Sequence, residues 1–111
     1  MAVTLYGIKT CDTCRKAAKE LGASGIKVVF HDVRADPLGA DQIAKFLQAF
    51  GDALLNKKST TWRGLDDAAR AAAPLALLAE HPTLMKRPVI EGPGGLTLGW
   101  TAEAKAAHLA G

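Results

Sequence analysis

The sequence predicts an α/β fold, a small mixed sheet covered by helices, in one domain of 111 residues. A strand–helix–strand pattern opens the chain, and a strand–strand–helix pattern around a glycine-rich turn closes it. Only helical patterns lie between these two parts. Because 49% of the residues are hydrophobic and 23% are charged, the chain can bury a core, which argues against a disordered protein.

The first part of the chain is a predicted β-α-β unit. Apolar and polar residues alternate over residues 3–6, which indicates a strand, and residues 15–21 are rich in alanine and lysine, which favours a helix. Gly22 and Gly25 mark the helix exit and a turn. Residues 27–33 form the second predicted strand. Two strands joined by a helix are normally parallel, with a right-handed crossover.

Residues 37–84 are predicted to be an all-helical insertion between core segments 1–36 and 85–111, because they are too few for an independent core. Asp41 is the expected N-cap of its first helix, and Gly51 closes that helix. The apolar face of the helix has i, i+3, i+4, i+7 spacing and consists of Ile43, Phe46, Leu47 and Phe50. A polar linker over residues 56–61 then leads to two short helices, 66–72 and 74–80.

The last part of the chain is a predicted hairpin and helix. Strands are expected at residues 88–90 and 96–98, separated by the turn sequence Gly92-Pro93-Gly94-Gly95. Thr101 can cap a final helix, with Glu103 in its first turn. The order of elements is therefore β-α-β, helices, β-β-α.

Two cysteines, Cys11 and Cys14, lie at the turn between the first strand and the first helix. The free N–H groups of a first helical turn and the positive end of the helix dipole favour an anion there. A thiolate is such an anion, so the pKa of Cys11 should fall below its free value of about 8.5. Cys11 is the candidate nucleophile, and Cys14 is placed to resolve the species that Cys11 forms.

Charge and cysteine usage narrow the class of protein. The net charge of +3 comes from dispersed basic residues, which disfavours nucleic-acid binding but suits a small anionic ligand. With both cysteines in one motif, none is left for a long-range structural disulfide. The N-terminal residues lack the pattern of a signal peptide, and the longest uncharged apolar run, residues 71–79, is too short to span a membrane. We expect a cytoplasmic protein with no membrane partner.

Short segments along nearly the whole chain resemble the arsenate reductase-like family, which includes ArsC, Spx and the YffB proteins, and they are most similar to the YffB branch. These segments are Leu5-Tyr6-Gly7-Ile8-Lys9, Cys11-Asp12-Thr13, Phe30-His31-Asp32, Ala53-Leu54-Leu55-Asn56, Thr60-Thr61-Trp62-Arg63 and Lys86-Arg87-Pro88. The resemblance implies a thioredoxin-like core and a glutathione-dependent thiol reductase activity. It implies no bound cofactor, with glutathione as co-substrate.

The same resemblance implies roles for individual residues. Cys11 matches the nucleophilic cysteine, and Pro88 matches a cis proline that faces it. The residues implied to bind substrate or glutathione are Thr13, Arg15, Arg63, Arg87 and Pro88. Of the arginines, Arg15 is expected to hold the thiolate, and Arg63 is expected to bind the carboxylates of glutathione.

Two departures from the family pattern define alternative functions. Arsenate reductases of this type carry a third arginine beyond the Arg-Pro pair, whereas this chain has no arginine after Arg87, so arsenate reduction ranks below the other hypotheses. Many YffB proteins have an apolar residue where this chain has Cys14. A cysteine pair there resembles Spx, which implies a redox-sensing regulator that binds RNA polymerase, although Spx proteins carry a longer C-terminal tail.

Other interpretations of these residues remain open. A CxxC pair can be half of a zinc site, but His31, His81 and His108 are widely spaced, so no metal is expected. Cys14 can instead be a small buried hydrophobic residue, which would make the mechanism monothiol. Without the resemblance, Arg15 and Arg63 would be read as surface charges.

Overall fold

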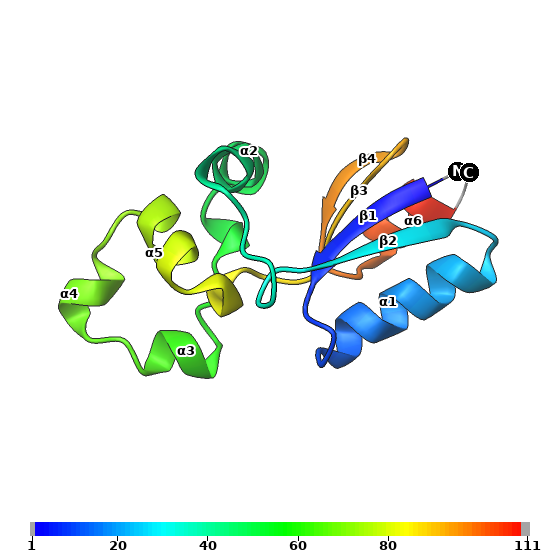
Figure 1. The fold of residues 1–111 in the computed structure, drawn as a ribbon. Helices are drawn as coiled ribbons and strands as arrows, with labels where there is room; N and C mark the ends of the chain where they lie inside the picture. The colour runs from blue at the N-terminus through cyan, green and yellow to red at the C-terminus, as the bar shows by residue number, and fades with distance from the viewer. Residues whose placement is uncertain (1, 110–111) are drawn as a thin grey trace. The chain divides into compact units, whose positions relative to one another are not determined.

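The computed structural model describes residues 2–109, which form two compact units. The first contains the residues up to Val33 together with those from Arg87 onward, and the second is Arg34–Lys86 (Figure 1).

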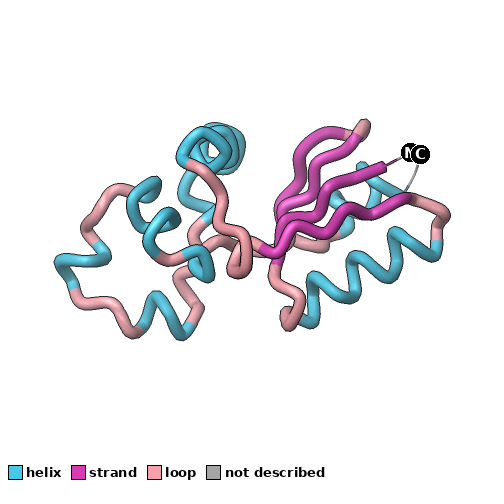
Figure 2. The backbone as a smooth tube through the Cα atoms, in the orientation of Figure 1, coloured by secondary structure: helices cyan, strands magenta, loops and turns pink. Residues whose placement is uncertain are grey.

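The first unit is built on a four-stranded mixed sheet with the strand order β2-β1-β3-β4 (Figure 2). Strand β1 (Ala2–Gly7) pairs in parallel with β2 (Lys27–Asp32) and antiparallel with β3 (Val89–Gly92). Strand β4 (Gly95–Leu98) completes the sheet in a hairpin with β3. The predicted α/β fold with a mixed sheet is confirmed, and β1 lies in the middle of it.

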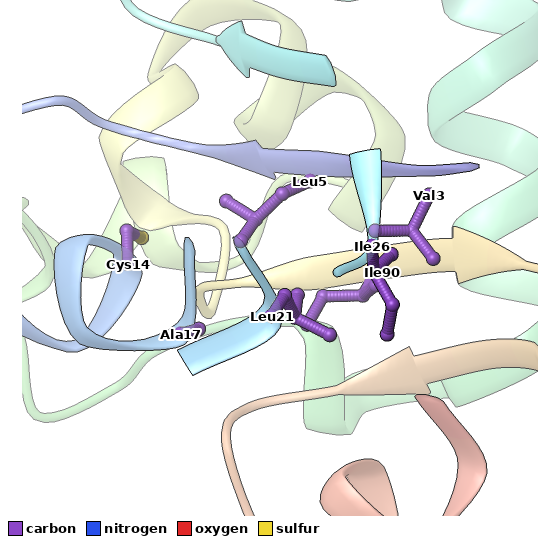
Figure 3. Packing of buried hydrophobic residues seen from close by; sticks show 7 residues of the cluster. All are labelled: Val3, Leu5, Cys14, Ala17, Leu21, Ile26 and Ile90. Atoms are coloured by element: carbon purple, nitrogen blue, oxygen red, sulfur yellow. The ribbon is translucent and has the colours of Figure 1, made fainter. Parts of the chain in front are cut away.

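Helices α1 (Asp12–Ala23) and α6 (Ala102–Leu109) belong to the same unit. Buried side chains from α1 pack on the sheet in one cluster, formed by Val3, Leu5, Cys14, Ala17, Leu21, Ile26 and Ile90 (Figure 3). Leu109 of α6 and Trp100 pack against this cluster. The Trp100 indole N–H also donates to a carboxylate oxygen of Glu20 at 2.5 Å, which ties the segment before α6 to α1.

The second unit contains only helices and one isolated bridge among its described residues. Its elements are α2 (Ala40–Phe50), the 3₁₀ turn η1 (Gly51–Leu54), α3 (Thr60–Arg63), α4 (Asp67–Arg70), α5 (Pro74–Glu80) and the 3₁₀ turn η2 (Pro82–Leu84). Helices α2 and α5 pack together, and the buried residues of the unit are Ile43, Phe46, Leu54, Leu55, Leu77, Leu78, Leu84 and Met85. The Asn56 N–H donates to the Leu84 carbonyl at 2.8 Å, which holds together the two ends of the segment that contains α3, α4, α5 and η2.

Some element boundaries differ from the predictions. Helix α1 begins at Asp12 rather than at residue 15, because Cys11 is its N-cap residue. The N-cap of α2 is Gly39, so the predicted Asp41 cap is wrong; Asp41 lies in the first turn, where its charge suits the helix dipole. Part of the predicted polar linker is helical, since the Ser59 hydroxyl accepts a hydrogen bond from the Trp62 N–H at 3.1 Å and caps α3.

Within residues 2–109, no helix combines the length and the apolar character needed to cross a lipid bilayer.

Candidate active site

Cys11 lies between the central strand and the first helix of the sheet unit. It has extended backbone angles, and its carbonyl accepts the Arg15 N–H at 3.0 Å, the first hydrogen bond of α1. Its own N–H donates to the Ile8 carbonyl at 2.9 Å, so the Cys11 backbone is hydrogen-bonded both to the preceding loop and to α1. Cys11 is partly buried, and its thiol is not in a disulfide.

The surroundings of Cys11 lower its pKa. Burial alone would raise that pKa, but the Cys14 N–H and the Cys14 thiol both donate to the Cys11 sulfur and favour the thiolate. The Arg87 guanidinium adds a hydrogen bond and a positive charge. These favourable contacts outweigh the cost of burial, so the ionised form of Cys11 is stabilised.

Cys14 has the opposite character. It is fully buried on α1, and burial, the hydrogen bond to Cys11 and the negative charge of that neighbour raise its pKa to about 12. Gly7 leaves the room that this sulfur occupies, because a Cβ added at Gly7 would overlap the Cys14 sulfur. The pair therefore combines a cysteine whose thiolate is stabilised, Cys11, with a buried thiol, Cys14, that donates a hydrogen bond to it.

Arg87 lies near Cys11 because β1 pairs with β3, a strand far from it in the sequence. In the antiparallel register of β1 and β3, Val89 lies opposite Tyr6, so Pro88 falls at the level of Gly7, the last residue of β1, and Arg87 lies one residue further, at the level of the loop that leads to Cys11. The Arg87–Pro88 peptide bond is cis, as the family resemblance implies, and Pro88 is fully buried. The Pro88 carbonyl accepts the Gly99 N–H at 2.7 Å, which anchors this corner.

The other two predicted site residues on α1 lie outside this cluster. Thr13 and Arg15 are exposed, and the Arg15 guanidinium lies 4.0 Å from the Asp12 carboxylate. Arg15 is the cation expected to hold the thiolate, and the guanidinium that bonds to the Cys11 sulfur in the structure is that of Arg87. The expectation for Arg15 follows from the family resemblance, whereas the contact with Arg87 depends on the pairing of β1 with β3 across about 75 residues of chain.

Arg63 belongs to the helical unit, where it ends α3 as an exposed side chain. The neighbouring Arg70 holds this short helix at its C-terminus: its Nε donates to the Trp62 carbonyl at 3.2 Å, and its Nη2 donates to the Arg63 carbonyl at 3.1 Å. Lys57 and Arg70 also lie over the Trp62 ring, with their charged groups 5.6 and 5.8 Å from its centroid. Trp62 therefore packs within its own unit and supports the turn that presents Arg63.

The described part of the chain contains no group of three or more histidine, cysteine, aspartate or glutamate side chains that could hold a metal ion.

Comparisons with known proteins agree with this architecture. The model of the ArsC family matches residues 6–107. An uncharacterized protein of Haemophilus influenzae is 43% identical over 103 residues, which cover 88% of this chain and 90% of that protein. The global transcriptional regulator Spx of Bacillus subtilis is 30% identical over 91% of this chain and 82% of its own length. A solved structure of a YffB protein, 34% identical, superposes with a TM-score of 0.88 over 96% of this chain and 98% of that one.

Proposed function

This chain is a member of the ArsC family, and we propose that it is a glutathione-dependent thiol-disulfide oxidoreductase with the Cys11 thiolate as nucleophile. The observation that carries the proposal is the set of donors around one sulfur. The Cys14 N–H, the Cys14 thiol and the Arg87 guanidinium all favour the ionised form of Cys11. A thiolate with a lowered pKa both attacks a disulfide and leaves one again, which is what a thiol-exchange catalyst needs.

The first step is attack by the Cys11 thiolate on one sulfur of a substrate disulfide. A new disulfide forms between Cys11 and that sulfur, the substrate S–S bond breaks, and the other half leaves as a thiolate. The leaving thiolate carries the negative charge that Cys11 held. Arg87 lies where this charge moves and stabilises it on either sulfur.

Cys14 can complete the reaction once Cys11 is in a mixed disulfide. Two causes of its high pKa, the hydrogen bond to Cys11 and the charge of Cys11, depend on the Cys11 thiolate and disappear in that state. In that state burial still raises the pKa of Cys14, and the charge of Arg87 still lowers it. Cys14 can lose its proton to solvent and attack the Cys11 sulfur; the Cys11–Cys14 disulfide forms, the mixed disulfide bond breaks, and the second half of the substrate leaves as a thiolate. Two glutathione molecules then reduce the internal disulfide, giving glutathione disulfide.

Arg63 is the proposed partner for a glutathione carboxylate. Its side chain is exposed, and Arg70 fixes the two carbonyls at the end of its helix, so the guanidinium extends from an ordered turn. A guanidinium binds a carboxylate through two parallel hydrogen bonds, which suits this role. Arg63→Ala should then raise the KM for glutathione with a smaller effect on kcat.

The test is turnover of a glutathione mixed disulfide, followed as production of glutathione disulfide. Cys11→Ser should abolish turnover, and the matched variant Cys14→Ser separates the two mechanisms. Loss of activity in both variants supports the dithiol route, while activity retained in Cys14→Ser supports a monothiol route. A wild-type rate no higher than that of glutathione alone would refute the proposal.

One finding favours a second candidate, a redox-sensing regulator. The Spx protein of Bacillus subtilis is 30% identical over most of this chain, and the chain carries the cysteine pair whose oxidation would make a switch. In that case oxidation to the Cys11–Cys14 disulfide would change binding to a protein partner such as RNA polymerase. Thiol-dependent binding of purified polymerase without disulfide turnover would support the regulator.

A further inference from the structure

The carboxylate of Asp32 is bound to the loop that leads to Cys11. Asp32 is the last residue of β2 and pairs with Gly7, the last residue of β1. Its Oδ2 accepts the Lys9 N–H at 3.1 Å, and the next residue, Val33, donates its N–H to the Gly7 carbonyl at 2.8 Å. Two consecutive residues at the end of β2 therefore hold the chain just after the central strand.

The peptide group between Ile8 and Lys9 links Asp32 to Cys11. Its N–H, which belongs to Lys9, donates to Asp32, and its C=O, which belongs to Ile8, accepts the Cys11 N–H at 2.9 Å. Because a trans peptide group is planar, its N–H and C=O point in opposite directions, so fixing one fixes the other. The Asp32 carboxylate thereby sets the direction of the carbonyl that holds the Cys11 backbone.

We propose that Asp32 is a positioning residue for the Cys11 nucleophile, acting through the Ile8–Lys9 peptide group. The Ile8 side chain is buried, which further restricts movement of this peptide group. With the peptide held, Cys11 stays at the N-cap of α1, where its sulfur meets the Cys14 N–H and the Arg87 guanidinium. The proposal rests on the nucleophilic role of Cys11 but not on any particular substrate.

Charge and position have opposite effects, which makes the proposal testable. A carboxylate acting only through its charge disfavours a nearby thiolate, so its removal would increase the thiolate fraction of Cys11. A carboxylate acting as an anchor has the reverse effect, because its loss lets the sulfur drift from its donors. Asp32→Asn removes the charge but keeps an oxygen acceptor, whereas Asp32→Ala removes both.

The experiment is the rate of Cys11 alkylation by iodoacetamide as a function of pH, mapped to the Cys11 peptide by mass spectrometry. Asp32→Ala should react roughly threefold to tenfold more slowly than wild type at neutral pH, as expected for one lost hydrogen bond, while Asp32→Asn stays within about twofold. Asp12→Asn is the matched charge control, since Asp12 is an exposed carboxylate next to Cys11 that does not hold the loop.

Equal behaviour of Asp32→Asn and Asp32→Ala, whether faster, slower or unchanged, would overturn the proposal. Thermal unfolding monitors whether each variant is folded, and Asp32→Ser, whose hydroxyl is too short to reach Lys9, replaces the alanine variant if that one does not fold. Alkylation needs neither glutathione nor a disulfide substrate. A failed turnover assay would therefore refute the proposed function and leave the role of Asp32 standing. Equal alkylation rates of the two Asp32 variants would refute the role of Asp32 and leave the proposed function standing.

Discussion

Replacing Cys14 by alanine should raise the pKa of Cys11 by about one unit. The substitution leaves the backbone N–H in place and removes only the thiol that donates to the Cys11 sulfur. A hydrogen bond to a charged group contributes about 1.5–3 kcal/mol, and one pKa unit corresponds to about 1.4 kcal/mol. Because a thiol is a weak donor and Cys11 is partly exposed to solvent, the lower end of this range applies.

The assay is the pH dependence of Cys11 alkylation in the reduced protein. Cys14→Ser is the matched control, because its hydroxyl can still donate to the thiolate, and the pKa of Cys11 in that variant should lie nearer the wild-type value. Thermal unfolding of all three proteins shows whether the small void left by alanine disturbs the fold. An unchanged or lower pKa of Cys11 in Cys14→Ala would refute the view that the second thiol stabilises the first.

Three further outcomes follow from the structure. Arg87→Gln should raise the pKa of Cys11, because it removes the charge that favours the thiolate, and alkylation kinetics measure that shift. Phe46→Ala should lower the free energy of unfolding by about 3–5 kcal/mol in urea titrations, since the ring is fully buried; a loss below about 1 kcal/mol would contradict that packing. Burial lowers the pKa of His108, whose Nε2 lies 2.8 Å from the Thr97 hydroxyl. The unfolded chain therefore binds a proton at this histidine at a higher pH than the folded protein does, so the free energy of unfolding should fall as the pH drops below about 6.5. His108→Gln should flatten that dependence in denaturation curves recorded across the pH range.

Most of the fold could be predicted because it rests on local patterns. Alternation over residues 3–6 and the apolar face of α2 follow directly from the periods of a strand and a helix. Helix α3 could not be predicted in this way, because four residues are too few to show a period, and its start depends on one hydroxyl contact from Ser59. The Gly39 cap was missed for a related reason, since a glycine cap offers no side-chain signal.

From the sequence motif itself, only the two cysteines of the site could be predicted. Cys11 and Cys14 stand out because their spacing and their place before a helix carry chemical meaning. Arg87 was named as a site residue through the family resemblance, but its role as the cation beside the thiolate depends on the pairing of β1 with β3. The contacts of Gly7 and Asp32 also link residues that periodicity leaves unconnected, although both residues end strands of the observed sheet next to the cysteine loop.

The central claim is that the donors around Cys11 lower its pKa below that of a free cysteine, and the thiolate absorbance of the wild-type protein, titrated in the ultraviolet, tests it most directly. Cys11→Ser supplies the baseline, since it retains only the Cys14 thiol. We expect a transition below the free-cysteine value of about 8.5 that is absent from Cys11→Ser. A transition at or above that value would show that burial outweighs the surrounding donors, and the proposed nucleophile would lose its physical basis.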